Sequence, residues 1–161
     1  MTAAIDAKSF WRCLGERAIG ATVVTVDGEA GPAGFLALSA SHVSADPPTM
    51  LVSIDKRTGA YADILARRRF AINILPAEAT GLADAFGGKT AAKGADRFEP
   101  GAWTTLSTGA PVLASALGVF DCEVEEVIDR GGVALVIGRV LALASKGEGA
   151  PLVAFRGQYR S

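Results

Sequence analysis

Residues 34–55 read GFLALSASHVSADPPTMLVSID, and this segment carries the most informative pattern in the sequence. It predicts a strand, a short proline-locked loop and a second strand from Met50 to Ile54. Asp46-Pro47-Pro48 ends the first strand, because proline has no N–H to donate to a sheet and restricts the residue before it. The basic and hydroxyl turn Lys56-Arg-Thr58 follows the second strand.

The first of these strands has an unusual distribution of side chains. Successive side chains point to opposite faces of a strand, so two sets are expected. One face would hold Ala37, Ser39, Ser41 and Val43, and the other would hold Leu36, Leu38, Ala40 and His42. The strand is too polar for a dry core and too apolar for a freely solvated surface. Short hydroxyl side chains let a flat ligand or a phosphate approach the backbone, which predicts a binding wall; a polar face turned toward water is the alternative.

In this order, the motif small-Ser-x-Ser-x-Val-Ser-x-Asp-Pro-Pro, an apolar strand and a basic, hydroxyl turn resemble the flavin reductase-like family. Further similar fragments lie along nearly the whole chain: Phe70-Ala-Ile-Asn-Ile-Leu75, Leu82-Ala-Asp-Ala-Phe-Gly-Gly-Lys89, Asp96-Arg-Phe98, Pro111-Val-Leu113, Cys122-Glu-Val124, Ile137-Gly-Arg-Val140, Pro151-Leu152 and Phe155-Arg-Gly-Gln-Tyr159. The resemblance implies a mainly β (α+β) fold, an FMN-binding split β-barrel of six or more mostly antiparallel strands with flanking helices. It implies one domain over residues 1–161.

The resemblance also implies an activity. Proteins of this family transfer hydride from NADH or NADPH to FMN or FAD, and reduced flavin then reaches a partner monooxygenase. It implies a homodimer in the cytoplasm. The alternatives are an FMN-bound oxidoreductase acting on another small molecule, such as a corrinoid, and a non-enzymatic flavin-binding protein.

The resemblance assigns the flavin to several segments. Ser39 and Ser41 would hydrogen-bond the ribityl chain or the phosphate, with backbone groups of the same strand at the ring edge. Thr58 would cap a helix whose first turn receives the phosphate, with Lys56 or Arg57 adding charge or remaining solvated. The full set is Ala37, Leu38, Ser39, Ala40, Ser41, His42, Ser53, Ile54, Asp55, Thr58, Phe86, Gly88, Lys89 and Tyr159. For Phe86 and Lys89 the alternative to flavin contact is a phenylalanine in the core and a lysine on the surface, and we weight the two equally. Arg97-Phe98 would cover the cofactor. Tyr159 would reach the site across a dimer interface.

Two positions depart from the family pattern. Family reductases commonly carry a histidine before Ile-Gly-x-Val that places the nicotinamide, and that position is Val133 here. His42 stands where the family usually has a small residue. It would either replace the missing histidine or pack against a neighbouring strand, and we favour packing. Arg130 is a candidate contact for a dinucleotide phosphate.

Composition excludes several other classes of function. The net charge of −1 gives no electrostatic basis for binding nucleic acid, and one histidine cannot build an imidazole-rich zinc site. Cys13 and Cys122 lack metal-ligand spacing, and without a recognisable signal peptide we expect reduced thiols in a cytosolic protein. No apolar run reaches the ~20 residues that cross a bilayer. No catalytic Ser, Cys or His constellation is evident, so a cofactor would carry the reaction.

Elsewhere, periodicity and turn residues predict the remaining elements. Apolar spacing of Phe10, Leu14 and Ala18 predicts a helix from Asp6 to Ala18. Further predicted helices are Gly59 to Arg68, with Arg67-Arg68-Arg69 as a solvated end, and Pro76 to Phe86. Predicted strands are Ala21 to Val26 with an Asp27-Gly28 turn, Phe70 to Leu75, Gly118 to Ile128, Val133 to Ala144 and a closing Leu152 to Tyr159; Lys89 to Thr108 is expected to be irregular. Half of the residues are hydrophobic and only 20% are charged, which suggests apolar surface hidden in a subunit interface.

Overall fold

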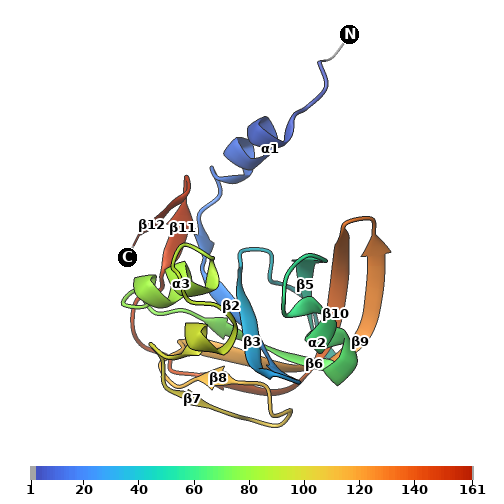
Figure 1. Cartoon of the computed structure of the whole chain (residues 1–161), viewed down its shortest axis with the longest axis vertical. Helices are drawn as coiled ribbons and strands as arrows, with labels where there is room; N and C mark the ends of the chain where they lie inside the picture. Colours follow the sequence, from blue (N-terminus) through green and yellow to red (C-terminus); the bar gives the residue numbers. More distant parts are fainter. Residues whose placement is uncertain (1–2, 161) are drawn as a thin grey trace.

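A computed structural model describes residues 3–160 of the chain, and it is built on one curled antiparallel sheet (Figure 1). Seven strands lie in the order β3-β2-β6-β9-β10-β5-β4. Their bounds are Gly31–Ala37 (β3), Thr22–Gly28 (β2), Arg69–Ile74 (β6), Gly118–Arg130 (β9), Val133–Ser145 (β10), Pro48–Asp55 (β5) and Ser41–Ala45 (β4). The predicted mainly β architecture with antiparallel strands and flanking helices is confirmed.

Smaller elements surround this sheet. A three-stranded sheet combines β1 (Ile19–Gly20), β11 (Val153–Phe155) and β12 (Gln158–Arg160), and a small hairpin combines β7 (Trp103–Thr104) with β8 (Val112–Leu113). The helices are α1 (Ala7–Leu14), α2 (Tyr61–Arg67), α3 (Thr80–Phe86) and the 3₁₀ turn η1 (Gly94–Phe98). The segment from Lys89 to Thr108 is largely irregular, as predicted. The predicted closing strand instead belongs to the separate sheet with β1.

Residues 34–45 were predicted to form one strand, but they form two. This difference explains how the barrel splits. β3 ends at Ala37 and β4 begins at Ser41, with residues 38–40 outside any strand. β3 pairs with β2 at one edge of the sheet, whereas β4 pairs with β5 at the opposite edge. Four peptide steps span at most about 14 Å, so the two edges must approach each other there. The sheet therefore curls into a barrel that stays open at this break.

Other boundaries also differ from the prediction. The first hairpin turns at residues 29–30, because Gly28 still pairs with Gly31. Pro76 forms an isolated bridge with Pro151, so α3 begins four residues later than predicted. The turn between β9 and β10 does use its glycines, with Gly131 at φ +64°.

The predicted N-terminal helix is shorter and lies differently. It runs from Ala7 to Leu14, with Asp6 as the N-cap accepting a 2.7 Å hydrogen bond from the Ser9 N–H. None of its residues is buried, and Figure 1 shows it projecting from the body of the molecule. Its apolar side chains are therefore not buried by residues 3–160, although Trp11 and Leu14 line a hollow together with Leu38 and Phe155.

Two apolar clusters lie on opposite faces of the sheet. β2 serves both, since Val23 belongs to one cluster and Val24 and Val26 to the other. The first cluster lies under α3 and the irregular segment, and the second fills the barrel beside α2. A strand covered on both faces reads as a continuous apolar run, which is why residues 22–26 show no alternation.

Buried polar groups fix the irregular segment to the sheet. The Asn73 side chain donates to the Val23 carbonyl (3.1 Å) and accepts from the Leu113 N–H (2.9 Å). Buried Asp121 accepts the Thr108 N–H at 2.8 Å. Each group is paired, as burial requires, and no side-chain nitrogen or oxygen buried in residues 3–160 lacks a partner.

The triple arginine is not simply a solvated helix end. Arg67 is exposed there as predicted, but Arg68 caps α2 in a left-handed conformation (φ 57°) and donates to the Val124 carbonyl at 3.1 Å. Arg69 begins β6 and forms a bidentate ion pair with Asp27, with Nε 2.8 Å from Oδ1. This ion pair lowers the pKa of Asp27 through its hydrogen bonds. Neighbouring arginines therefore have three different roles.

Candidate functional site

The break between β3 and β4 is the centre of the candidate site. Leu38 and Ser39 are exposed there and Ala40 is half-buried. The Ser39 hydroxyl donates a 2.9 Å hydrogen bond to the Ser53 carbonyl on β5. This bond joins the break to β5 across the split of the barrel. The hydroxyl is thus close to the backbone of β5, as the sequence indicated, although it already has a partner within the chain.

β5 carries the next three predicted residues, Ser53, Ile54 and Asp55. Ile54 is buried in the barrel core, so its side chain faces away from solvent. Ser53 and Asp55 alternate with it and share the opposite face, about 7 Å apart along the strand. Asp55 ends the strand and begins the turn that leads to α2.

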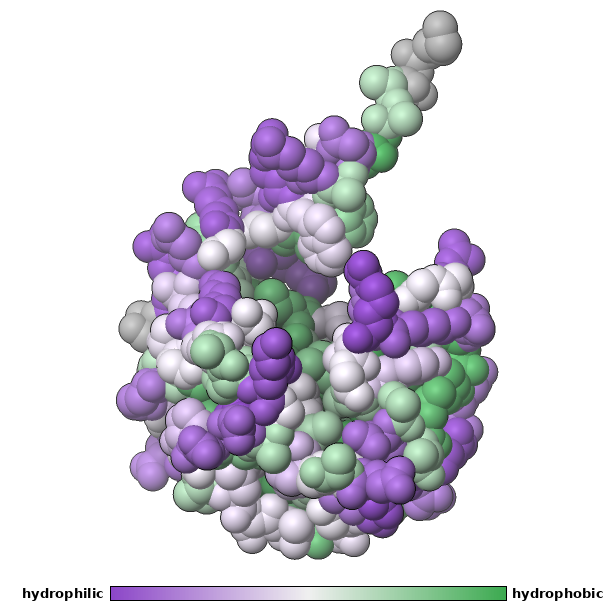
Figure 2. Space-filling view, viewed as in Figure 1, coloured by the Kyte–Doolittle hydropathy of each residue, from purple (hydrophilic) through white to green (hydrophobic). Residues whose placement is uncertain are grey.

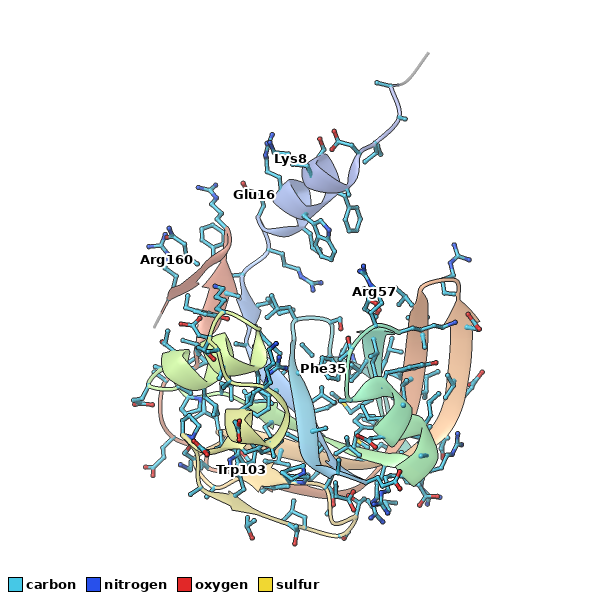
Figure 3. All side chains as sticks on the ribbon, viewed as in Figure 1. Lys8, Glu16, Phe35, Arg57, Trp103 and Arg160 are labelled. Atoms are coloured by element: carbon cyan, nitrogen blue, oxygen red, sulfur yellow. The ribbon has the colours of Figure 1, made fainter. Side chains whose placement is uncertain are left out.

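A carboxylate–guanidinium pair dominates this turn. Arg57 donates to Asp55 through Nε (3.1 Å) and Nη2 (2.8 Å), and its backbone N–H also donates to the same carboxylate at 2.9 Å. These hydrogen bonds lower the pKa of Asp55 to about 2. The Arg57 side chain is 91% exposed, and Figure 3 shows it pointing toward the open space beneath α1. A guanidinium held this way presents a fork that suits a phosphate as well as a carboxylate.

Thr58 lies in the same turn but does not cap α2. Its N–H donates to the Asp55 carbonyl at 2.9 Å, and its own carbonyl accepts the Tyr61 N–H at 3.0 Å. The helix begins at Tyr61, and Ala60 in the N-cap position has no side chain that could cap it. The sequence prediction of a helix capped by Thr58 is therefore wrong, because the turn consumes three residues before the helix starts.

The tip of the β9–β10 hairpin anchors this turn from the other side. The Lys56 ammonium pairs with Asp129 at 2.7 Å, and the Lys56 N–H donates to the Gly132 carbonyl at 3.0 Å. Val133, the position of the family histidine, pairs directly with Asp55 in the register of β10 and β5. The departure from the family pattern thus lies beside the Asp55–Arg57 pair.

His42 lies too far along the sheet to take that position. It pairs with Met50, five residues before Asp55 on β5, which corresponds to roughly 17 Å along the strand. It is exposed, and with Ser41 it lines a hollow of about 620 Å³ between β4, β5 and β10. His42 thus does not lie at the position of the missing histidine, and its side chain lines the hollow together with Met50 of the neighbouring strand β5. Both roles suggested for His42 stay predictions.

The remaining predicted residues gather on the β3 side of the break. The Phe86 ring is 2% exposed and packs edge-to-face on Phe98, with centroids 4.9 Å apart, and near Trp103 at 5.9 Å. This is the core role that the sequence left open for Phe86. It also places Phe98 in the core rather than over a surface.

Lys89 and Tyr159 meet outside that core. The Lys89 ammonium lies 5.1 Å from the centre of the Tyr159 ring and 3.8 Å from the Asp84 carboxylate. Burial, together with the Asp84 charge, raises the pKa of Tyr159. Gly88, at φ +76°, makes the turn that brings Lys89 back from the end of α3.

The structure therefore sorts the predicted residues into four places. Leu38, Ser39, Ala40, Ser53, Asp55 and Thr58 are linked around the split; Gly88, Lys89 and Tyr159 lie beyond β3; Ser41 and His42 line the hollow. The side chains of Ala37, Ile54 and Phe86 are in the core. Figure 2, in the same view, shows the surface hollowed between α1 and the position that Arg57 has in Figure 3.

Sequence reasoning missed the pairing within the turn. Asp55 and Arg57 are two residues apart, and an aspartate two residues before a donor is the signal for an Asx turn, but the bidentate contact depends on the turn conformation. Among residues 3–160, no cluster of three His, Cys, Asp or Glu could hold a metal ion. None of the helices in that range combines the length and apolarity that a membrane crossing needs.

Comparisons with known proteins agree with this geometry. A family model described as "Flavin reductase like domain" matches residues 14–161. The FMN reductase (NADH) RutF of Bradyrhizobium diazoefficiens is 39% identical over 138 residues, 86% of this chain and 74% of that protein. BorF, the flavin reductase component of a bacterial two-component tryptophan halogenase, superposes with a TM-score of 0.87 at 30% identity, covering 96% of this chain and 97% of that one. The NADH:FAD oxidoreductase SgcE6 of Streptomyces globisporus C-1027, solved with NAD and FAD fragments, gives 0.87 at 26% identity, covering 99% and 96%.

Proposed function

Because this chain belongs to the flavin reductase-like domain family, we propose that it is a flavin reductase that transfers hydride from NADH to FMN. A similar protein is named as an NADH-dependent FMN reductase, and another was solved with fragments of NAD and FAD. FAD is therefore a second flavin to test, and NADPH a second donor. The observation that carries the proposal is the exposed Arg57 guanidinium, which Asp55 orients through Nε and Nη2 beside the split of the barrel.

The residues around the split fit a phosphorylated flavin. Arg57 is exposed and already held in a bidentate geometry by an oxyanion, the Asp55 carboxylate. A phosphate offers the same paired oxygens. The hydroxyls of Ser39 and Thr58, with the backbone of residues 38–40, supply neutral hydrogen-bonding groups near this charge. We assign the phosphate to Arg57 and Thr58, and the ribityl chain to Ser39.

A bound flavin supplies the hydride-accepting ring, and the chain supplies binding, orientation and charge. Val133 offers no imidazole beside Asp55. We therefore propose that the shape of the site and neighbouring cationic side chains would position the nicotinamide instead. Arg130, exposed and paired in register with Val133, is the cation we assign to the dinucleotide phosphates. No side chain is required to form a bond with either substrate.

The proposal extends to partners. Flavin reductase components of two-component systems are among the similar structures, so we propose that reduced flavin is handed to an oxygenase or halogenase component. We propose one domain over residues 1–161, a cytoplasmic location and a homodimer. The low content of charged residues supports only the homodimer, because it suggests apolar surface hidden between subunits. Sedimentation of the purified protein measures its oligomeric state directly.

Anaerobic titration tests the activity. Purified protein mixed with FMN and NADH should bleach the flavin spectrum, and turnover should rise with added free flavin if the flavin diffuses away. FAD and NADPH are tested in parallel to rank the substrates. If neither flavin binds and no nicotinamide is consumed, the proposal is wrong.

One observation favours a second function. The histidine that helps to place nicotinamide in the family is Val133 here, so a flavin-binding protein without reductase activity is the alternative. Stoichiometric FMN binding with no oxidation of NADH or NADPH would support that alternative. A variant Val133→His that gains or increases NADH oxidation would show that this position limits the reaction.

A further inference from the structure

A hollow of about 230 Å³ lies beneath α1 and opens beside the candidate site. Trp11 and Leu14 of α1 form one wall, and Phe155 of β11 forms another. Leu38, the first residue of the break between β3 and β4, also lines the hollow. Figure 2 shows apolar surface, in green, on the floor of the space beneath α1. Leu38 therefore belongs both to this hollow and to the candidate site.

The lining of the hollow suits one flat apolar group. Most of its exposed surface is carbon, and its two charged residues, Arg17 and Arg156, are exposed. Sites that enclose a whole drug-sized ligand usually measure about 300–1,000 Å³, so this smaller hollow fits one end of a larger molecule. An aromatic ring without hydrogen-bonding groups at that end would match the side chains of Trp11 and Phe155.

The C-terminal end of α1 is fixed at the rim of the hollow. The Arg156 N–H donates to the Gly15 carbonyl at 3.0 Å, and the Arg156 guanidinium pairs with Glu16 at 2.7 Å. The same guanidinium lies 4.9 Å from the centre of the Phe155 ring. Arg156 makes these contacts from the turn between β11 and β12, where its φ of 50° is uncommon for a residue other than glycine. These contacts keep the last turn of α1, with its apolar side chains, over the hollow.

An FMN bound as proposed above would have its ring beside Leu38. Its phosphate is assigned to Arg57 and Thr58 and its ribityl chain to Ser39, and FMN joins phosphate, ribityl chain and ring in that order. Figure 3 shows Arg57 across the open space from α1. A ring that continues past Ser39, away from Arg57, therefore meets Leu38 and then the hollow. The outer end of the flavin ring carries two methyl groups and no hydrogen-bonding atom, which matches the apolar lining.

We propose that the hollow beneath α1 receives the dimethyl-substituted end of the flavin ring, and that Trp11 is a binding residue that covers it. This inference rests on the proposed function and deepens it. The family model matches residues 14–161, so Trp11 lies outside the matched segment and family membership does not supply its role. The Trp11 side chain is 65% exposed, and covering an apolar ring would remove part of that surface from water. Helix α1 would then exclude water from this end of the ring and slow the release of flavin.

Binding of three flavins tests the contact. FMN, FAD and riboflavin share the ring, but riboflavin lacks the phosphate and only FAD has an adenosine half. Trp11→Ala should raise all three dissociation constants by a similar factor of about ten, as is typical when one aromatic neighbour of a flat heteroaromatic ring is removed. Fluorescence titration measures each constant. Because Trp11 is not buried, thermal unfolding of the flavin-free variant should match the wild type.

A matched control lies one residue away. Phe10 is 54% exposed on the same helix but does not line the hollow, so Phe10→Ala should leave all three dissociation constants within about twofold. Leu14→Gln, which changes the same wall as Trp11, should weaken all three severalfold. Flavin emission is quenched by an indole in contact with the ring, so the fluorescence lifetime of bound FMN should be longer in Trp11→Ala than in the wild type or in Phe10→Ala.

The outcomes separate this inference from the proposed function. If Trp11→Ala weakens FAD alone, the hollow takes the adenosine half and the proposal is overturned. Unchanged binding in Trp11→Ala or Leu14→Gln, or an equal loss in Phe10→Ala, would overturn it too. Oxidation of NADH by the wild-type protein with added flavin is measured on the same samples. Turnover there, with unchanged flavin binding in Trp11→Ala, would leave the reductase function intact and reject only the role of α1; absence of flavin binding to the wild type would reject both.

Discussion

Asp55→Asn should strengthen the binding of FMN rather than weaken it. Asp55 occupies the Arg57 fork through hydrogen bonds of 2.8 and 3.1 Å, and its low pKa of about 2 keeps it ionised at any neutral pH. Asparagine can still accept the Arg57 N–H that shapes the turn, and the Thr58 N–H donates to a backbone carbonyl that the substitution leaves in place. The substitution therefore removes a competing charge and preserves the turn.

The expected change in the FMN dissociation constant follows from the distance between the phosphate and the Asp55 carboxylate and from their charges. A phosphate on the open side of the Arg57 guanidinium would lie roughly 7 Å from the Asp55 carboxylate. At this separation in a water-like dielectric, removing one charge that faces a dianion changes the dissociation constant roughly threefold to tenfold at low salt. The effect should shrink in physiological salt, because the Debye length there is about 8 Å.

Titration of FMN fluorescence at low and high salt measures this effect. Asp129→Asn is the matched control, since it removes the same charge from the neighbouring Lys56 ion pair. Arg57→Gln should weaken binding roughly tenfold, as expected for the loss of a charge-assisted contact. If Asp55→Asn weakens FMN binding while the fold stays intact, or if only Asp129→Asn strengthens it, Arg57 is not the phosphate ligand.

Three further predictions concern stability and reactivity. Gly138→Ala should lower the free energy of unfolding by roughly 2–3 kcal/mol in denaturant titrations, because the new Cβ would lie 2.6 Å from the Phe70 ring and 2.9 Å from the Cβ of Cys122. The ion pair of Asp27 lowers its folded-state pKa, so its contribution to stability is present above about pH 4 and is lost as the pH falls through the folded value. Unfolding of Asp27→Asn should thus depend less steeply on pH in acid. Ellman's reagent should titrate Cys13 at once and Cys122 only after unfolding, since burial raises the pKa of Cys122 to about 12.

Each of these has a control. Gly132→Ala, where an added Cβ meets no atom within 4 Å, should leave stability within about 0.5 kcal/mol. Arg69→Gln removes the partner of Asp27 and should reduce the acid dependence in the same way as Asp27→Asn. If both Cys13 and Cys122 react rapidly with Ellman's reagent in the native protein, the prediction for Cys122 is wrong and the strand that carries it, β9, exposes its thiol without global unfolding.

The sequence determined the strands and the family, because these depend on local patterns. Long β segments separated by turn glycines predict a hairpin where the partner strand is adjacent in the chain, as for β9 and β10 around Gly131. The ordered motifs along the chain predict that Ser39, Ser53, Asp55 and Thr58 lie within the same region. These features require only neighbouring residues, and the neighbouring residues are fixed by the chain itself.

The tertiary structure alone decided where the chain changes partners. Residues 34–45 alternate like one strand, yet the segment breaks at Leu38–Ala40 because its two halves pair with opposite edges of the sheet. Likewise, apolar spacing predicts helix α1, but does not reveal that none of its side chains is buried among residues 3–160. Periodicity reports which side chains share a face; only the folded sheet determines what that face meets, since long-range pairing depends on residues distant in sequence.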